Sequence, residues 1–96
     1  MTLKKPLRRA VTAVLQNNNF DYWVCIQNID TNVMSYAVLK KGEVSFGKEE
    51  MRLFVPNKIT FRIPYVEVED FSEFPGRKQI EIRLRGRILI SIREIK

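Results

Sequence analysis

The first apolar residues of the chain recur at helical spacing. Between Pro6 and Asn17 they fall at intervals of three and four, which places one stripe of a helix against a core (Leu7, Ala10, Val11, Val14 and Leu15). Pro6 suits the first helical turn, and the asparagines after Gln16 tolerate the left-handed conformation that ends helices. The pattern predicts an amphipathic helix over about residues 6–17.

Residues 20–95 consist instead of short apolar and polar alternations, which are typical of β-strands. With the helix they predict an α+β fold in one domain over residues 1–96. We expect an N-terminal amphipathic helix followed by a curved antiparallel sheet or small barrel of about six or seven strands. In the strand Phe20–Ile26 both alternating sets are largely apolar, so this strand is either buried on both faces or exposes Trp23 to a partner.

Turn residues predict two strand pairings. A three-residue loop at 40–42 pairs Val33–Leu39 with Val44–Phe46 and requires a positive φ at its glycine. The strands 51–55 and 59–63 form a second pair around a proline-containing turn.

The segment after Pro64 is the acidic part of the chain. Pro64 cannot donate a hydrogen bond to a β-ladder and marks an edge, a bend or a strand end. Beyond it, Tyr65–Phe71 is expected to resume as a strand with Val66 and Val68 facing inward. The acidic residues from Glu67 to Glu73 then occupy a solvated face, where they are more typical of a soluble edge than of a general acid/base pair.

The last twenty residues carry the clearest alternation. A loop of odd length centred on Gly86 sets Ile82 opposite Ile90, so that Arg83 and Leu89 share the other face. The sequence predicts a two-stranded ribbon with an aliphatic inner face and an arginine-rich outer face and tip.

The net charge of +6 is concentrated at the two ends of the chain: residues 1–19 carry +4, residues 20–76 carry −3 and residues 77–96 carry +5. Cations near the N-terminus of a helix oppose its dipole at a cost of roughly 0.3–1 kcal/mol each at low salt. Either something other than local helix energetics favours these cations, or this end is frayed and solvated. The basic residues that we regard as candidate contacts to a polyanion are Lys4, Lys5, Arg8, Arg9, Arg83, Arg85, Arg87 and Arg93.

The residue inventory argues against an enzyme. The chain has no histidine and one cysteine, Cys25, which excludes an intrachain disulfide, a Cys/His metal site and an imidazole base. Cys25 lies among apolar neighbours and is expected to be a small core hydrophobe. The four glycines are isolated, so no phosphate-binding loop is present. We predict no catalytic residue, no metal and no cofactor.

The longest apolar run, Tyr22–Ile26, is far shorter than the ~18 residues that a membrane span requires. The apolar run near the N-terminus is too short for a signal peptide, so we expect a cytoplasmic protein without a membrane span.

Nucleic acid is the leading ligand hypothesis, because Lys and Arg clusters that meet phosphates release counterions and an arginine-bearing ribbon can clamp a backbone. The sequence shows no RRM, KH, zinc-finger or helix-turn-helix signature and no evident aromatic platform for stacking bases. The competing explanation is that Arg83, Arg85 and Arg87 pair internally with the acids of 67–73.

A protein-interaction module is the alternative. The segment Ile59–Ile92, with Ile63-Pro64-Tyr65 and an isoleucine hairpin, resembles bacterial pleckstrin-homology-like domains over about a third of the chain, although the helix here is at the opposite end. Exposure of Trp23 or Leu89, together with a C-terminal edge strand, would favour a homodimer or strand addition to a protein partner. Binding of the basic helix to a membrane surface ranks last, because the helix lacks bulky interfacial anchors.

Overall fold

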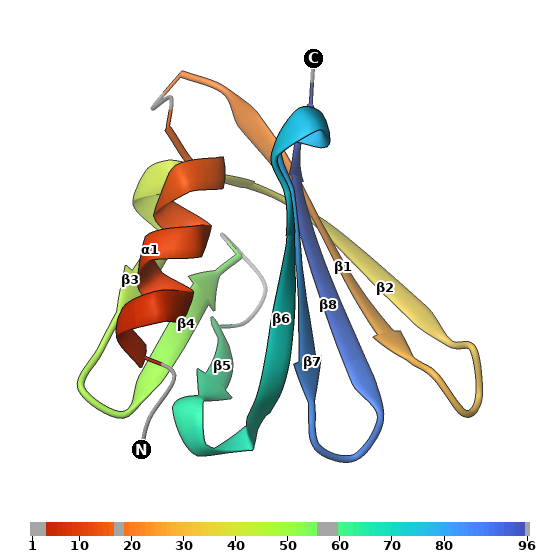
Figure 1. The fold of residues 1–96 in the computed structure, drawn as a ribbon. Coiled ribbons are helices and arrows are strands. Elements are labelled where there is room, and N and C mark those ends of the chain that lie inside the picture. The colour runs from red at the N-terminus through yellow and green to blue at the C-terminus, as the bar shows by residue number, and fades with distance from the viewer. Residues whose placement is uncertain (1–3, 17–18, 56–59, 96) are drawn as a thin grey trace.

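A computed structural model describes residues 4–16, 19–55 and 60–95, which form one helix and eight strands (Figure 1). The helix, α1, spans Lys4–Val14. The strands are β1 (Asp21–Asn28), β2 (Met34–Lys40), β3 (Val44–Phe46), β4 (Glu50–Phe54), β5 (Thr60–Pro64), β6 (Val68–Phe74), β7 (Gln79–Leu84) and β8 (Ile88–Glu94). Three short 3₁₀ turns join them, η1 (Lys41–Glu43), η2 (Tyr65–Glu67) and η3 (Pro75–Arg77).

The strands form two antiparallel sheets, one of five strands in the order β2-β1-β8-β7-β6 and one of three in the order β3-β4-β5. The predicted α+β class and the antiparallel pairing are confirmed. The expectation of a curved antiparallel sheet is confirmed in part, and its alternative, a small barrel, is wrong because the five-stranded sheet does not close. The described strands number eight instead of six or seven and are divided between two sheets. The turns η1 and η2 carry the chain from one sheet to the other and back.

One core joins the helix and both sheets. The predicted helical stripe is confirmed, since Leu7, Val11 and Val14 are buried against β7 and β8. Figure 1 shows α1 and the three-stranded sheet on the same side of the five-stranded sheet. We call this side of the five-stranded sheet its inner face and the opposite, solvated side its outer face. The helix ends earlier than predicted, at Val14, and part of the expected C-terminal end lies outside the described residues.

The predicted pairing of residues 33–39 with 44–46 is wrong. Strand β2 pairs with β1, and Gly42 is absent from the residues with positive φ. The loop is the 3₁₀ turn η1, which begins where the Glu43 carboxylate accepts a hydrogen bond from the Lys40 amide at 2.7 Å. This turn directs β3 into the other sheet instead of back along β2.

The predicted pair formed by residues 51–55 and 59–63 is confirmed as β4 and β5, while its turn lies outside the described residues. The expectation that Val66 faces inward is wrong, because Val66 is 71% exposed. Alternation stops after Pro64, where η2 turns Tyr65 into the core and Val66 out to solvent.

The predicted register of the C-terminal ribbon is confirmed. Ile82 lies opposite Ile90, and Arg83 lies opposite Leu89. Gly86 takes φ of 80°, a left-handed conformation that glycine adopts without steric cost. The C-terminal strand is nevertheless not an edge, because β8 lies between β1 and β7 in the centre of its sheet.

Candidate nucleic-acid interface

The basic residues of the helix fall into two groups. The Lys4 ammonium and the Arg8 guanidinium lie over the rings of Tyr65 and Phe46, at 5.8 and 5.6 Å from the ring centroids. These cation–π contacts provide a structural reason for cations at the unfavourable end of the helix dipole. Lys5 and Arg9 are exposed and have no ion pair within the described residues.

The basic residues of the C-terminal hairpin are partly neutralised inside the fold. Arg83 forms an ion pair with Asp70 and a hydrogen bond of 2.8 Å to the Ser72 hydroxyl. Arg87 pairs with Asp30, which lies outside the acidic stretch that we expected to neutralise the hairpin. The charges of Arg83 and Arg87 are therefore paired with acidic side chains of the same chain.

Arg85 and Arg93 differ from these two. Both are exposed, and neither has an ion-pair partner in the described part of the chain. The Arg85 backbone N–H donates to the Glu67 carbonyl at 2.8 Å, which fixes the tip of the hairpin against η2.

The two basic segments do not share one face of the five-stranded sheet. The helix covers the inner face through Leu7 and Val11, whereas Arg83 alternates with the inward Ile82 and so lies on the outer face. Arg93 lies on the outer face as well, because it pairs directly with Trp23 of β1.

A row of side chains crosses the outer face at the level of Arg93. The register of the four strand pairs sets the residues of β2, β1, β8, β7 and β6 side by side in the order Val38, Trp23, Arg93, Gln79 and Phe74. Two polar side chains, Arg93 and Gln79, lie at the centre of the row, with the indole of Trp23 on one side of them and the phenyl ring of Phe74 on the other.

The next row carries Tyr36, which completes an aromatic pair. The rings of Trp23 and Tyr36 are perpendicular, with centroids 5.5 Å apart. Beside them is an open hollow of about 480 Å³, lined by Trp23, Cys25, Tyr36, Gln79, Ser91 and Arg93. A planar ring placed in this hollow would contact an aromatic surface with a guanidinium, an amide and a hydroxyl around it.

A second hollow, of about 610 Å³, extends the first toward the end of the sheet. It shares Trp23, Gln79 and Arg93 with the first hollow and adds Glu94, Ile95 and Arg77. The Arg77 guanidinium lies 5.7 Å from the centroid of the Phe74 ring. Neither Arg77 nor Arg93 has an ion pair within the described residues. Glu81 lies one row away and accepts a long hydrogen bond, 3.4 Å, from the Gln79 amide. Two guanidiniums without an ion pair in the described structure therefore lie on the β8 side of the Trp23 indole.

The two residues predicted as an interface, Trp23 and Leu89, do lie on the same outer face. Both are half-buried, and only Trp23 lines the hollow. Cys25 also faces outward and lines the hollow, so the expectation that it belongs to the core is wrong.

Sequence reasoning missed the roles of Tyr36, Phe74 and Arg77. The alternation within each strand was visible, and it places Tyr36 and Trp23 on defined faces of their own strands. The order of the strands was not visible, and only that order places the three aromatic side chains on one surface.

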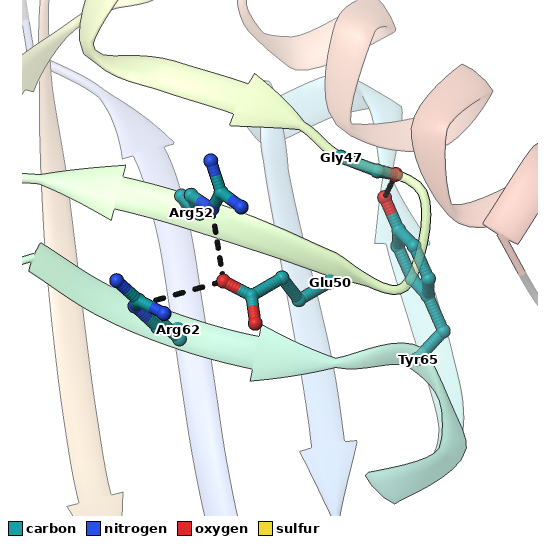
Figure 2. A network of polar contacts seen from close by, with 5 residues as sticks. All are labelled: Gly47, Glu50, Arg52, Arg62 and Tyr65. Carbon is teal, nitrogen blue, oxygen red and sulfur yellow. Dashed lines mark hydrogen bonds and ion pairs between the residues drawn. The ribbon is translucent and has the colours of Figure 1, made fainter.

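A separate polar network lies on the three-stranded sheet (Figure 2). The Glu50 carboxylate lies 2.9 Å from Arg52 Nε and 3.7 Å from Arg62 Nε, and the Tyr65 hydroxyl donates to the Gly47 carbonyl at 2.9 Å. Burial raises the pKa of the Tyr65 hydroxyl above its ordinary value, against the opposing effect of Arg8 and with a smaller contribution from Glu50 in the same direction. These contacts join β4 to β5 and tie η2 to the loop between β3 and β4.

Within residues 4–16, 19–55 and 60–95, no three potential metal-ligating side chains lie together, and no helix is long and apolar enough to cross a membrane. Comparison with family models, with curated proteins and with solved structures found no match for the chain.

Proposed function

We propose that this chain is a non-enzymatic domain that binds single-stranded nucleic acid on the outer face of its five-stranded sheet. An unpaired base enters the hollow beside the Trp23–Tyr36 pair and stacks on the exposed aromatic surface, and the adjoining phosphates contact Arg93 and Arg77. The hollow itself carries the proposal, because it combines an aromatic pair with two guanidiniums that have no acidic partner in the described structure.

Stacking on an aromatic side chain contributes about 1–3 kcal/mol per base and requires a base face that is not covered by neighbours in a duplex. An open sheet also offers no protruding element that would enter a groove of B-DNA. Both arguments favour single strands over duplex. The net charge of +6 adds a long-range attraction that accelerates encounter and weakens with salt.

The proposal differs from the sequence hypothesis in the location of the site. Of the basic residues expected to bind nucleic acid, Arg93 belongs to the hollow, whereas Lys4 and Arg8 contact aromatic rings and Arg83 and Arg87 are in ion pairs. Lys5, Arg9 and Arg85 remain available for secondary contacts with a longer strand.

Intrinsic fluorescence tests the proposal directly, because Trp23 is the only tryptophan of the chain. Titration with a single-stranded oligonucleotide of mixed sequence should quench this fluorescence, and a matched duplex should bind far more weakly in a competition assay. Replacing Trp23→Ala should weaken binding, followed by the anisotropy of a labelled oligonucleotide, by roughly 5- to 150-fold, which corresponds to the stacking energy of one base.

The matched control is Val66→Ala, which changes an exposed apolar residue on η2, outside the hollow. It should leave the affinity unchanged. Equal binding by wild type and Trp23→Ala, with both folded by circular dichroism, would show that the hollow is not the binding site.

A further inference from the structure

The free edge of β2 lacks the features that normally protect an exposed strand. Strand β2 is at the end of the five-stranded sheet, and its register with β1 runs without a bulge from Met34 to Lys40. Residues 31–39 contain no charge and no proline. Native edge strands usually carry charges, proline or bulges that prevent pairing with another chain.

Large apolar side chains are exposed along this strand and just before it. Their exposed fractions are 63% for Val33, 41% for Met34, 56% for Tyr36 and 50% for Val38. An uncharged edge strand with several exposed apolar side chains can pair with a strand of another chain.

The backbone groups that face the open edge can be identified from the hydrogen bonds of β1. The Asn28 N–H donates to the Val33 carbonyl at 2.9 Å, so Val33 directs its backbone groups toward β1. Successive residues of a strand direct them to opposite sides, so Met34, Tyr36 and Val38 direct theirs to the open edge. Lys40 has the same parity, and its N–H is already bonded to the Glu43 carboxylate.

We infer that a second copy of this chain pairs with β2, antiparallel, about a two-fold axis at Tyr36. In this register Tyr36 meets its own counterpart, and Met34 meets Val38 of the second copy. The three open N–H groups and three open carbonyls of each copy then form six hydrogen bonds across the axis, and none of these backbone groups is left over.

The charges of the strand favour this partner and this register. Lys40 is the only charged residue of β2, and it is neutralised by Asp21 at 2.7 Å. Pairing about Tyr36 sets Lys40 opposite Asn32, so the two lysines lie at opposite ends of the junction. An uncharged strand is best matched by another uncharged strand, and a second β2 provides one.

The other free edges of the described sheets are poorer partners. Strand β6 carries Glu69, Asp70 and Glu73, and β3 has only three residues. Strand β5 carries Arg62. Self-pairing of β2 therefore leads to a closed dimer with a continuous sheet of ten strands, twice the five of one copy.

Light scattering during gel filtration tests the inference without nucleic acid. The wild type should show a mass twice that of the 11.4 kDa chain, falling toward the monomer on dilution. Tyr36→Lys and Tyr36→Glu each set like charges directly opposite one another across the axis, and each should be monomeric. Mixed in equal amounts they should form a dimer again, because the axis then joins opposite charges.

The control is Val66→Lys, which adds the same charge at an exposed apolar residue outside β2 and should remain dimeric. Circular dichroism should show all variants folded, since Tyr36 is more than half exposed. A monomeric wild type at all concentrations overturns the inference, and a mixture that stays monomeric overturns the register.

A covalent trap provides an independent measurement. Directly opposed residues of a hydrogen-bonded antiparallel pair have Cα atoms about 5.5 Å apart, which a disulfide can bridge. Tyr36→Cys in a Cys25→Ser background should therefore oxidise to a covalent dimer, whereas Val66→Cys in the same background should not. The hollow beside Trp23 is complete within one copy, so a monomeric result leaves the proposed nucleic-acid function standing, and failure of nucleic-acid binding leaves the dimer standing.

Discussion

The two faces of the five-stranded sheet are made by the same strands and differ in almost every physical property. On the inner face, Ile80, Ile82, Ile90 and Ile92 are fully buried with the helix packed over them. On the outer face, the residues that alternate with these isoleucines include Arg93 and the half-buried wall of the hollow. Successive side chains of a strand point to opposite faces, so one residue contributes to the core and the next lies on the face where we propose binding.

The contrast indicates how substitutions should act. Changes to the inner face remove buried contacts and should be measured as lost stability. Changes to the outer face remove groups that solvent already reaches, and should be measured as lost binding with the fold intact. Each of the following predictions tests this division.

The largest effect is expected for the inner face. Ile82→Ala or Ile90→Ala should lower the free energy of unfolding by ~2–5 kcal/mol, because each leaves a cavity in the centre of the core. Leu89→Ala, at the adjoining half-buried outer position, should cost clearly less in denaturant unfolding. A greater loss for Leu89 than for Ile82 would mean that the faces are assigned the wrong way round.

The next largest loss of stability is expected at the turn around Gly86, which sets the register of β7 and β8. Gly86→Ala has free space for the added methyl group but must hold an alanine at φ of 80°, which costs about 1–2 kcal/mol. The measurement is again denaturant unfolding, with Gly42→Ala as the control, because Gly42 has open space and no positive φ. Equal losses for the two variants would remove the conformational argument.

Tyr65 is buried and carries a polar hydroxyl. Removing this hydroxyl should lower the free energy of unfolding by less than the substitution of Gly86. Tyr65→Phe removes the hydrogen bond to the Gly47 carbonyl and should cost roughly 0.5–1.5 kcal/mol. Burial raises the pKa of Tyr65 in the folded state, so the unfolded state loses the proton first, near the ordinary value of 10.0. The stabilisation is therefore complete below pH 10 and is lost as the pH rises through the folded pKa. The difference in stability between wild type and Tyr65→Phe should shrink over that range and stay constant below it.

Local patterns in the sequence predicted the local parts of this fold. The helical stripe and the register around Gly86 depend on residues close in the chain, and both are confirmed. Val66 was misplaced because an apolar and acidic alternation continues through a 3₁₀ turn, where period two no longer describes which side is buried.

The outer hollow could not be predicted for a different reason. It joins Trp23 of β1 to Arg93 of β8, which pair across most of the length of the chain. The sequence contains the correct parity for each strand but no local signal for which strands become neighbours. The loop at 40–42 added a misleading signal, because it resembles a hairpin and instead transfers the chain to the other sheet.

The smallest effect on stability is expected for the outer-face arginines, and it should accompany a clear effect on binding. Arg77→Gln with Arg93→Gln should change the free energy of unfolding by no more than about 0.5 kcal/mol, because both residues are exposed and without ion pairs in the described structure. Each phosphate contact on a single strand contributes about −0.7 to the slope of log K against log salt, so the double variant should flatten that slope by about 1.4.

Arg85→Gln with Arg87→Gln is the matched control, since it removes the same charge from the tip of the β7–β8 hairpin. Its slope should change less, because Arg87 is held by Asp30 and the tip lies away from the hollow. The opposite result, with the slope flattened by the hairpin pair and unaffected by Arg77 and Arg93, would move the binding site from the face of the sheet to the basic tip. The sheet would then keep its division into two faces, but the outer face would have no proposed ligand, and the pairing proposed for β2 would concern only the edge of the sheet.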